Sequence, residues 1–277
     1  MGMVINTNVM AINAQRNLSN TTANLSTSMA RLSSGQRITA AKDDAAGLAI
    51  SEKLKAQIRG LGQAERNAND GISLVQTAEG AMDEISSMLI RMRELAIQAA
   101  NGTTDSSQKG FLNTEFQQLA TEITRIADAT SFNSASLLNG DTSITLQVGI
   151  GTSAANDQMT VDFRDVSADT SYMGNVAGET INTASAALSA IGAIDTAITN
   201  LSEQRGKLGA FQNRLASTVR NLATTRENLS ASNSRIRDVD VADESVNMTR
   251  SQILMQAGSS ILAQANQIPS MALSLIG

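Results

Sequence analysis

The sequence of 277 residues contains no cysteine, no histidine and no tryptophan, and only one tyrosine, five phenylalanines and one proline. Without cysteine or histidine the chain has no thiolate nucleophile, no imidazole base and no zinc site of the Cys/His type. It also has no disulfide framework, so cysteine usage does not indicate a compartment. The net charge of -5 argues against a phosphate-binding surface, so no nucleic-acid partner is expected. We expect no catalytic residues, no metal and no cofactor.

Few aromatic residues and few prolines also limit the fold. Aromatic residues make up 2% of the chain, which is too little for a thick globular core. Pro269 is preceded by a long proline-free run, which suits uninterrupted helices. No run approaches the length of a membrane-spanning helix, so no membrane insertion is expected. The first residues, MGMVINTNVM, lack a cationic start and an apolar core, so no cleaved secretion signal is expected.

The strongest periodic signal lies at residues 194–236. We call it the central heptad row, and its apolar members recur every seven residues: Ile194, Leu201, Leu208, Leu215, Leu222, Leu229 and Ile236. Positions four residues later complete a 4-3 pattern: Ile198, Arg205, Gln212, Val219, Arg226 and Asn233. This pattern is typical of a coiled coil, and the helix would be about 65 Å long. We expect the polar members to fix the register of helix pairing.

Two further helices are expected upstream. The first spans about 44–100, with Asp43 or Asp44 as its cap and Asn101-Gly102 as its stop. Three internal glycines allow a break, because each costs roughly 1 kcal/mol against alanine: Gly60, Gly62 and Gly71. The second helix carries apolar residues from Leu112 to Ile126. The expected fold is mainly α, a long antiparallel coiled-coil bundle formed by the N- and C-terminal halves, with one small β-hairpin.

The β-hairpin is expected at residues 144–163, where the apolar period changes to two. Ile144, Leu146, Val148 and Ile150 alternate with smaller or polar residues, and Met159, Val161 and Phe163 do so again after the turn sequence GTSAAND. A hairpin alone is marginal in water, so it must pack on the helices. Residues 165–186 are polar, contain glycine and show no period, which predicts a surface loop.

Both ends of the chain repeat apolar residues every seven positions but carry almost no charge. The N-terminal row is Val4, Ala11, Leu18, Leu25 and Leu32, and the C-terminal row is Leu254, Ile261, Ile268 and Leu275. Residues 1–36 contain only the charges of Arg16 and Arg31, and residues 245–277 only that of Arg250. Because a solvated helix face is ordinarily charged, these ends are expected to be buried against other protein. Flexible tails are the alternative, and the one favoured for the free monomer.

Two motifs that could indicate chemistry have simpler interpretations. Asn-Leu-Ser begins at residues 17, 24, 200 and 228, but each leucine occupies a heptad position, which favours packing over glycosylation. Acidic residues occur at 43–44 and at 238–244, where predicted helices end. Neither group has the spacing of a calcium loop, so capping is favoured over a metal site or a carboxylate-based enzyme.

Several long motifs, in order, resemble bacterial flagellin. The N-terminal motifs are LSSGQRITAAKDDAAGLAISEKLKAQIRGL (32–61), NANDGISLVQTAEGAM (67–82) and RMRELAIQAANG (91–102). The C-terminal motifs are SRIRDVDVADES (234–245) and QILMQAGSSILAQANQIPSMALSLIG (252–277). The resemblance covers roughly residues 1–150 and 185–277. Flagellins usually carry outer domains between these halves, so this chain resembles a core-only form.

The resemblance implies a secreted, extracellular subunit that polymerises with itself into the bacterial flagellar filament, the propeller for swimming. Residues 1–34 plus 245–277 would form the inner filament core, and 35–164 plus 187–244 the outer wall, with 165–186 where relatives insert outer domains. The terminal heptad rows would pair on assembly. Implied partners are an export chaperone, the type III export apparatus, and the cap and hook–filament junction proteins. The alternative is a hook–filament junction or adaptor protein.

The resemblance also implies an immune-receptor contact. Residues 91–98 resemble the segment that the vertebrate flagellin-sensing Toll-like receptor reads. By motif position the contacts in this chain would be Arg91, Leu95 and Glu115. From periodicity alone, the same stripe is a charged face at the rim of the bundle.

Overall fold

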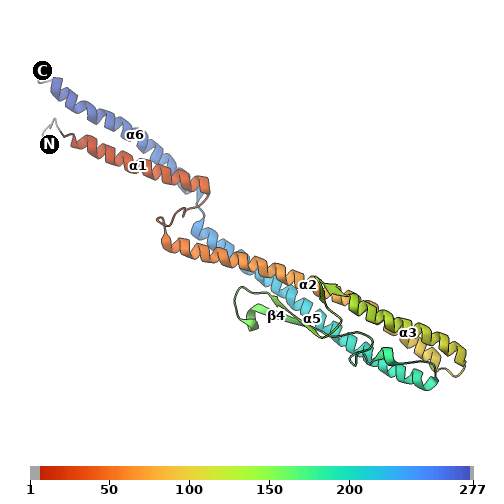
Figure 1. Cartoon of the computed structure of the whole chain (residues 1–277). Helices are drawn as coiled ribbons and strands as arrows, with labels where there is room; N and C mark the ends of the chain where they lie inside the picture. Colours follow the sequence, from red (N-terminus) through yellow and green to blue (C-terminus); the bar gives the residue numbers. More distant parts are fainter. Residues whose placement is uncertain (1–6, 275–277) are drawn as a thin grey trace. The chain divides into compact units, whose positions relative to one another are not determined.

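The computed structural model describes the backbone of residues 7–274 and the side chains of residues 7–267. It is mainly helical, as expected (Figure 1). The helices are α1 (Val9–Ser34), α2 (Ala45–Ala100), α3 (Ser106–Ala129), the short α4 (Ala154–Asp157), α5 (Ala184–Arg237) and α6 (Val241–Ser274). The strands are β1 (Ser131–Phe132), β2 (Ala135–Ser136), β3 (Thr142–Gln147) and β4 (Gln158–Phe163). Within these described residues, none of the helices has the combination of length and apolarity needed to span a membrane.

The chain divides into two compact units, which we call the terminal unit (Met1–Ile58 with Glu227–Gly277) and the central unit (Arg59–Arg226). This division differs from the expected boundaries at residues 34 and 245, because residues 35–58 pack with 227–244. Arg37 donates from its backbone N to the Arg237 carbonyl at 2.6 Å, and Ser51 donates to Asn233 at 2.8 Å. Ile38 is buried in the same region.

The central unit is a helical bundle formed by α2, α3 and α5. Its core contains the first five members of the central heptad row. Five members of that row are buried, Ile194, Leu201, Leu208, Leu215 and Leu222, while Leu229 and Ile236 are half-buried in the terminal unit. A second buried row lies three residues after the first and includes Ala190, Ala197, Gln204 and Phe211. The expected second row, four residues after the first, is half-buried, because the core surrounds more than one side of α5.

Polar members of the heptad pattern make specific contacts with α2. Arg205 pairs with Asp83 at 3.0 Å, and Arg226 pairs with Glu65 at 2.8 Å. In the terminal unit, Asn233 accepts the hydrogen bond from Ser51. Such cross-helix pairs favour one register of α2 against α5 over a register shifted by a turn, as the polar heptad positions predict.

Helix α2 runs without a break through its three internal glycines, and two of these glycines leave room for the hairpin. Asp44 caps the helix by accepting a hydrogen bond from the Gly47 N–H at 2.8 Å. A Cβ at Gly60 would approach Ile150, and a Cβ at Gly71 would clash with Leu146. Close backbone approach of the hairpin therefore explains two residues that otherwise weaken a helix.

The hairpin of β3 and β4 has the register that the alternation predicts. Ile144 pairs with Val161 and Leu146 with Met159, so the apolar side chains share one face. Asn67 on α2 donates to the Gln147 carbonyl at 2.9 Å, and Gln204 on α5 donates to the Asp162 carbonyl at 2.7 Å. Both helices therefore hold the hairpin. The two-residue strands β1 and β2 form a second antiparallel pair, which was not predicted from the sequence.

The expectation of a surface loop at 165–186 is wrong for its apolar side chains. The backbone up to the start of α5 at Ala184 is irregular apart from a 3-10 turn at Val176–Gly178. Five side chains of this segment are nevertheless buried in the core: Val166, Ala168, Met173, Val176 and Ile181. Tyr172 donates to the Asn200 carbonyl at 2.7 Å, and Asn200 donates back to the Tyr172 carbonyl at 2.6 Å. Irregular backbone has no fixed period, so the pattern could not reveal this burial.

We predict that Gly71→Ala destabilises the protein although alanine is the better helix former. The matched control is Gly80→Ala, also within α2, where an added Cβ would meet nothing within 4 Å. The control should raise the free energy of unfolding by about 1 kcal/mol. In Gly71→Ala, overpacking against Leu146 and Leu215 should lower the free energy of unfolding by about 1–3 kcal/mol. Urea denaturation measures both, and equal stabilisation by the two variants would contradict the docking of the hairpin at Gly71.

Candidate assembly interface

The terminal unit pairs α1 with α6 in antiparallel orientation within one chain (Figure 1). On α1 the least exposed positions follow 4-3 spacing: Ala11, Ala14, Leu18, Thr21, Leu25, Ser28 and Leu32. On α6 they do so as well: Glu244, Met248, Ser251, Met255, Gly258, Leu262 and Ala265. We call these two sets the paired faces. Their spacing is that of a two-stranded coiled coil, with several small or polar residues at core positions.

Within one chain, described members of the N-terminal heptad row face α6, whereas those of the C-terminal row do not face α1. Leu25 is buried, and Leu18 lies over Gly258, where an added Cβ would be 3.3 Å from the Leu18 Cδ1 atom. Leu254 and Ile261 instead lie away from α1, with 52% and 58% of their surface exposed. Leu18 of α1 therefore packs over a glycine of α6, which leaves a hole for the leucine side chain.

Other expectations for these rows have different outcomes. Val4 and Leu275 lie outside the described residues, and so does the side chain of Ile268. The sequence favoured unpaired ends in the free monomer, whereas the structure pairs α1 and α6 within a single chain. The two members of the C-terminal row whose side chains are described, Leu254 and Ile261, are therefore left uncovered by α1.

Polar contacts hold the α1–α6 pair at two points far apart along the helices. Asn8 caps α1 by accepting a hydrogen bond from the Ala11 N–H, and it donates its amide to the Ala265 carbonyl at 2.7 Å. Near the other end of α1, Arg31 pairs with the buried Glu244 at 3.6 Å. Breaking a buried ion pair leaves one charge uncompensated, so this contact favours a single register of the pair.

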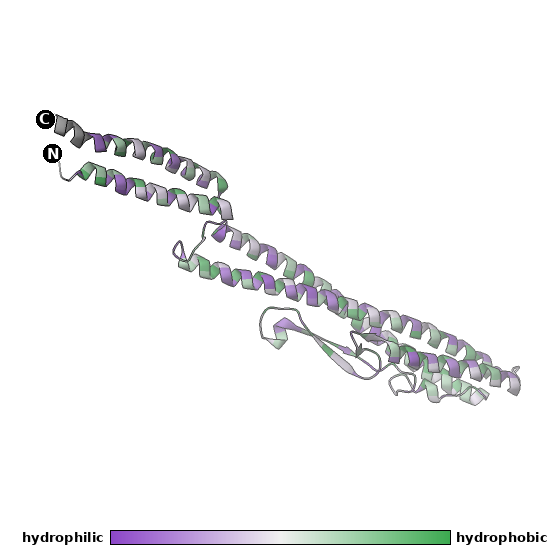
Figure 2. Cartoon of the chain, turned by 45° about the horizontal axis from the view of Figure 1, so that its top comes forward, coloured by the Kyte–Doolittle hydropathy of each residue, from purple (hydrophilic) through white to green (hydrophobic). Residues whose placement is uncertain are grey.

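The side of α6 opposite α1 is an exposed apolar stripe. We define the α6 stripe by its members Val246, Arg250, Ile253, Leu254 and Ile261, all of which are exposed. The first part of the stripe forms a shallow groove, lined also by Ser245 and Thr249. A helix that is apolar on both sides is ordinarily buried on both sides. The α6 stripe is therefore the best candidate in the described chain for an interface with another molecule. Figure 2 colours the ribbon of α6 by hydropathy, apart from the grey residues near its end.

Acidic residues at 43–44 and at 238–244 accept hydrogen bonds near the starts of α2 and α6. Asp240 caps α6 by accepting from the Ala242 N–H at 2.9 Å. Asp43 accepts hydrogen bonds from the Thr39 hydroxyl at 2.9 Å and the Ala40 N–H at 3.1 Å, and these bonds hold the pKa of its carboxyl below its ordinary value. No group of three or more metal-ligating side chains occurs among the residues that the structure describes.

The three expected receptor contacts do not share one exposed surface. Arg91 pairs with Glu115 at 2.9 Å and with Glu94 at 3.0 Å, and these hydrogen bonds raise the pKa of the Arg91 guanidinium. Leu95, however, is 1% exposed and belongs to the core of the central unit. The expectation of a direct contact through Leu95 is wrong for this structure, because motif position says nothing of which way a side chain points. Arg91 and Glu115 are half exposed.

Family models match both halves of the chain. The bacterial flagellin N-terminal helical region matches residues 5–143, and the bacterial flagellin C-terminal helical region matches residues 191–276. Flagellin of Halalkalibacterium halodurans is 50% identical over 275 residues, which cover 99% of this chain and 100% of that protein. The flagellar filament 33 kDa core protein of Treponema phagedenis is 42% identical over 285 residues, with 99% and 100% coverage.

A solved structure supports the fold. A flagellar hook-associated protein from Vibrio parahaemolyticus matches with a TM-score of 0.59 and 15% identity, covering 71% of this chain and 100% of that one. At this identity the likeness concerns the fold alone.

The fold defines a mainly helical protein whose two ends pair as a coiled coil. With matching family models over both halves and a relative of the same extent at 50% identity, the chain belongs to the bacterial flagellin family. The match in extent to the Halalkalibacterium halodurans protein agrees with a core-only form.

We predict that a disulfide can be built between α1 and α6 in this chain, which has no cysteine of its own. In the double variant Leu18→Cys with Gly258→Cys, the two Cβ atoms would lie 4.0 Å apart, within the range for a disulfide. The control pairs Leu18→Cys with Ile261→Cys, which lies on the exposed stripe. Non-reducing electrophoresis at low protein concentration should show an intramolecular bond only in the first variant. Preferential bonding of the control would contradict the observed pairing.

Proposed function

We propose that this chain is the structural subunit of the bacterial flagellar filament and polymerises through its terminal helices into the propeller used for swimming. The observation that carries the proposal is the α6 stripe, an apolar surface left uncovered after α1 and α6 have paired. Membership of the flagellin family and the likeness to a filament core protein support the same assignment. In this proposal, neighbouring copies cover the stripe.

Energetics favour burial of the stripe. Full burial of one isoleucine or leucine side chain contributes about 1.5–3 kcal/mol. Ile253, Leu254 and Ile261 are each at least half exposed, so covering them would contribute a substantial part of an association free energy. Exposed apolar side chains also occur on α1, at Val9, Met10, Ile12 and Met29. Both helices therefore carry surface for contact beyond their own partner helix.

The near absence of charge on α1 and α6 also favours burial of these helices between subunits. Residues 1–36 and 245–277 carry three of the 47 charges of the chain. A charge removed from water without a partner is costly, whereas serine, threonine, asparagine and glutamine can be buried if hydrogen-bonded. We infer that 1–34 and 245–277 contribute to the inner filament core and that the charged central unit faces outward. Residues 165–186 would then mark where longer flagellins insert outer domains.

Secretion and partner proteins follow from this function. We infer that the subunit leaves the cell through the flagellar type III export apparatus with an export chaperone, and that it meets cap and hook–filament junction proteins outside. Recognition by a host Toll-like receptor through Arg91 and Glu115 would require their ion pair to open. The hook–filament junction alternative has no specific support, because the likeness to a hook-associated protein concerns the fold alone.

Polymerisation of the purified protein tests the proposal directly. We expect long tubular filaments by electron microscopy, and removal of residues 1–30 or 250–277 should abolish them while circular dichroism shows the central unit still helical. Protein that forms only short caps or small oligomers would contradict the role of filament subunit.

A substitution in the stripe tests the interface. Ile261→Ser should raise the critical concentration for assembly by about tenfold or more, since about 1.4 kcal/mol corresponds to tenfold. The conservative control Ile261→Val removes one methylene, about 0.8 kcal/mol, and should raise it by about fourfold. Because Ile261 is exposed in the single chain, helicity should not change. An unchanged critical concentration in Ile261→Ser would show that the stripe does not drive assembly.

A further inference from the structure

One charge interrupts the α6 stripe. Arg250 is the single charged residue in 245–277, and it lies in the groove beside Val246, Ile253 and Leu254. Its side chain is exposed and has no ion-pair or hydrogen-bond partner among the side chains that the structure describes. A cation at the centre of a surface that becomes covered needs an acceptor, because an unpaired buried guanidinium is strongly destabilising.

The only carboxylates of α1 and α6 are those of Asp243 and Glu244, in the first turn of α6. Residues 1–36 contain no acid, and neither do residues 245–277. The nearest acids along the chain lie at the junction of α5 and α6, and two of them are already engaged: Asp240 with backbone N–H groups and Glu244 with Arg31. An acceptor for Arg250 must therefore come from outside its own helix pair.

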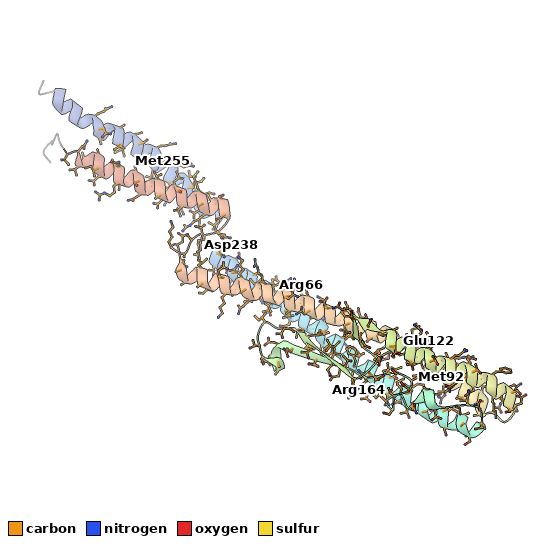
Figure 3. All side chains as sticks on the ribbon, viewed as in Figure 1. Arg66, Met92, Glu122, Arg164, Asp238 and Met255 are labelled. Carbon is orange, nitrogen blue, oxygen red and sulfur yellow. The ribbon has the colours of Figure 1, made fainter. Side chains whose placement is uncertain are left out.

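Two carboxylates at this junction remain free. Asp243, in the first turn of α6, and Asp238, labelled in Figure 3 and lying between α5 and α6, are exposed. Neither carboxylate has a partner among the described residues. Asp243 precedes Arg250 by two helical turns on the same side of α6. The separation is about 10.5 Å along the axis, too far for the two side chains of one helix to pair well.

The α6 stripe therefore carries an unpaired base, and unpaired acids lie at and just before the start of the same helix. Two identical stripes lying parallel would bring the base of one copy to the acids of the next if they are shifted along α6 by two turns or somewhat more. A contact between two different patches of the same surface is heterologous, and it propagates into a helical polymer when it does not close into a ring.

We propose that Arg250 of one subunit forms an ion pair with Asp243 or Asp238 of a neighbouring copy of this chain. This inference rests on the proposed filament function and assigns the charged contact within its otherwise apolar interface. Apolar side chains alone tolerate sliding, whereas a guanidinium paired with a carboxylate has a defined geometry. The ion pair would fix the stagger between neighbouring α6 helices. It would disfavour a neighbour that is shifted in the opposite direction along α6.

Charge reversal tests the pairing in the full-length chain. Arg250→Glu should raise the critical concentration by more than tenfold or abolish filaments, with helicity unchanged by circular dichroism. Combining Arg250→Glu with Asp243→Arg, or with Asp238→Arg, should restore filaments in one of the two double variants. The single variant of the aspartate that pairs with Arg250, either Asp243→Arg or Asp238→Arg, should assemble poorly. Arg250→Lys, which keeps the charge but not the planar fork, should assemble with a smaller defect.

The outcomes separate this inference from the function on which it rests. Wild-type assembly together with an unchanged critical concentration in Arg250→Glu would overturn the ion pair and leave the filament function intact. A defect that neither double variant relieves would also overturn it, since the acceptor would not be an acid of this junction. Failure of the wild-type chain to form filaments would instead count against the proposed function.

Discussion

The structure of the terminal unit depends on one constraint: α6 has two apolar sides and only one of them is covered by α1. The covered side combines small residues, Ser251, Gly258 and Ala265, with the larger Met248, Met255 and Leu262, and Leu18 of α1 lies over Gly258. Two further large side chains, Leu254 and Ile261, lie on the uncovered side. Intrachain packing thus leaves part of the hydrophobic gain of α6 for contacts with other molecules.

The central unit has the opposite character, because its core is complete within one chain. Apolar side chains of α2, α3, α5 and the hairpin are fully buried together, including Met82, Phe116 and Phe163. Its surface carries ion pairs such as Arg93 with Asp195 and Arg164 with Asp141. Exposed ion pairs contribute little to stability, but they keep a surface hydrated. The core of the central unit is therefore formed within one chain, whereas α6 keeps an uncovered apolar side.

Periodicity predicted the regular elements because a helix or strand repeats its environment. The long helices, the hairpin register of Ile144 with Val161 and the buried row from Ile194 to Leu222 all follow from it. The side of α6 that packs against α1 was harder to predict. A helix apolar on two sides has two candidate rows, and the row with larger residues was chosen although small residues at Ser251 and Gly258 form the intrachain contact.

Other features depend on tertiary contacts that no local pattern records. Irregular backbone at 165–186 buries Met173 and Ile181 without any period. Leu95 lies inside the core although Arg91 and Glu94 of the same motif are exposed, so a match of motif letters did not predict its accessibility. Gly60 and Gly71 were interpreted as weak points of α2, and their purpose became visible only with the hairpin in place.

In the proposed filament, neighbouring copies cover the α6 stripe while the α1–α6 pair of each copy persists. A cryo-electron microscopy reconstruction of filaments grown from this protein measures both at once. We predict that each α1 remains packed on the Ser251, Gly258 and Ala265 side of its own α6, with Leu254 and Ile261 buried against adjacent subunits. A filament in which these two side chains face open solvent, while the subunits contact one another elsewhere, would contradict it.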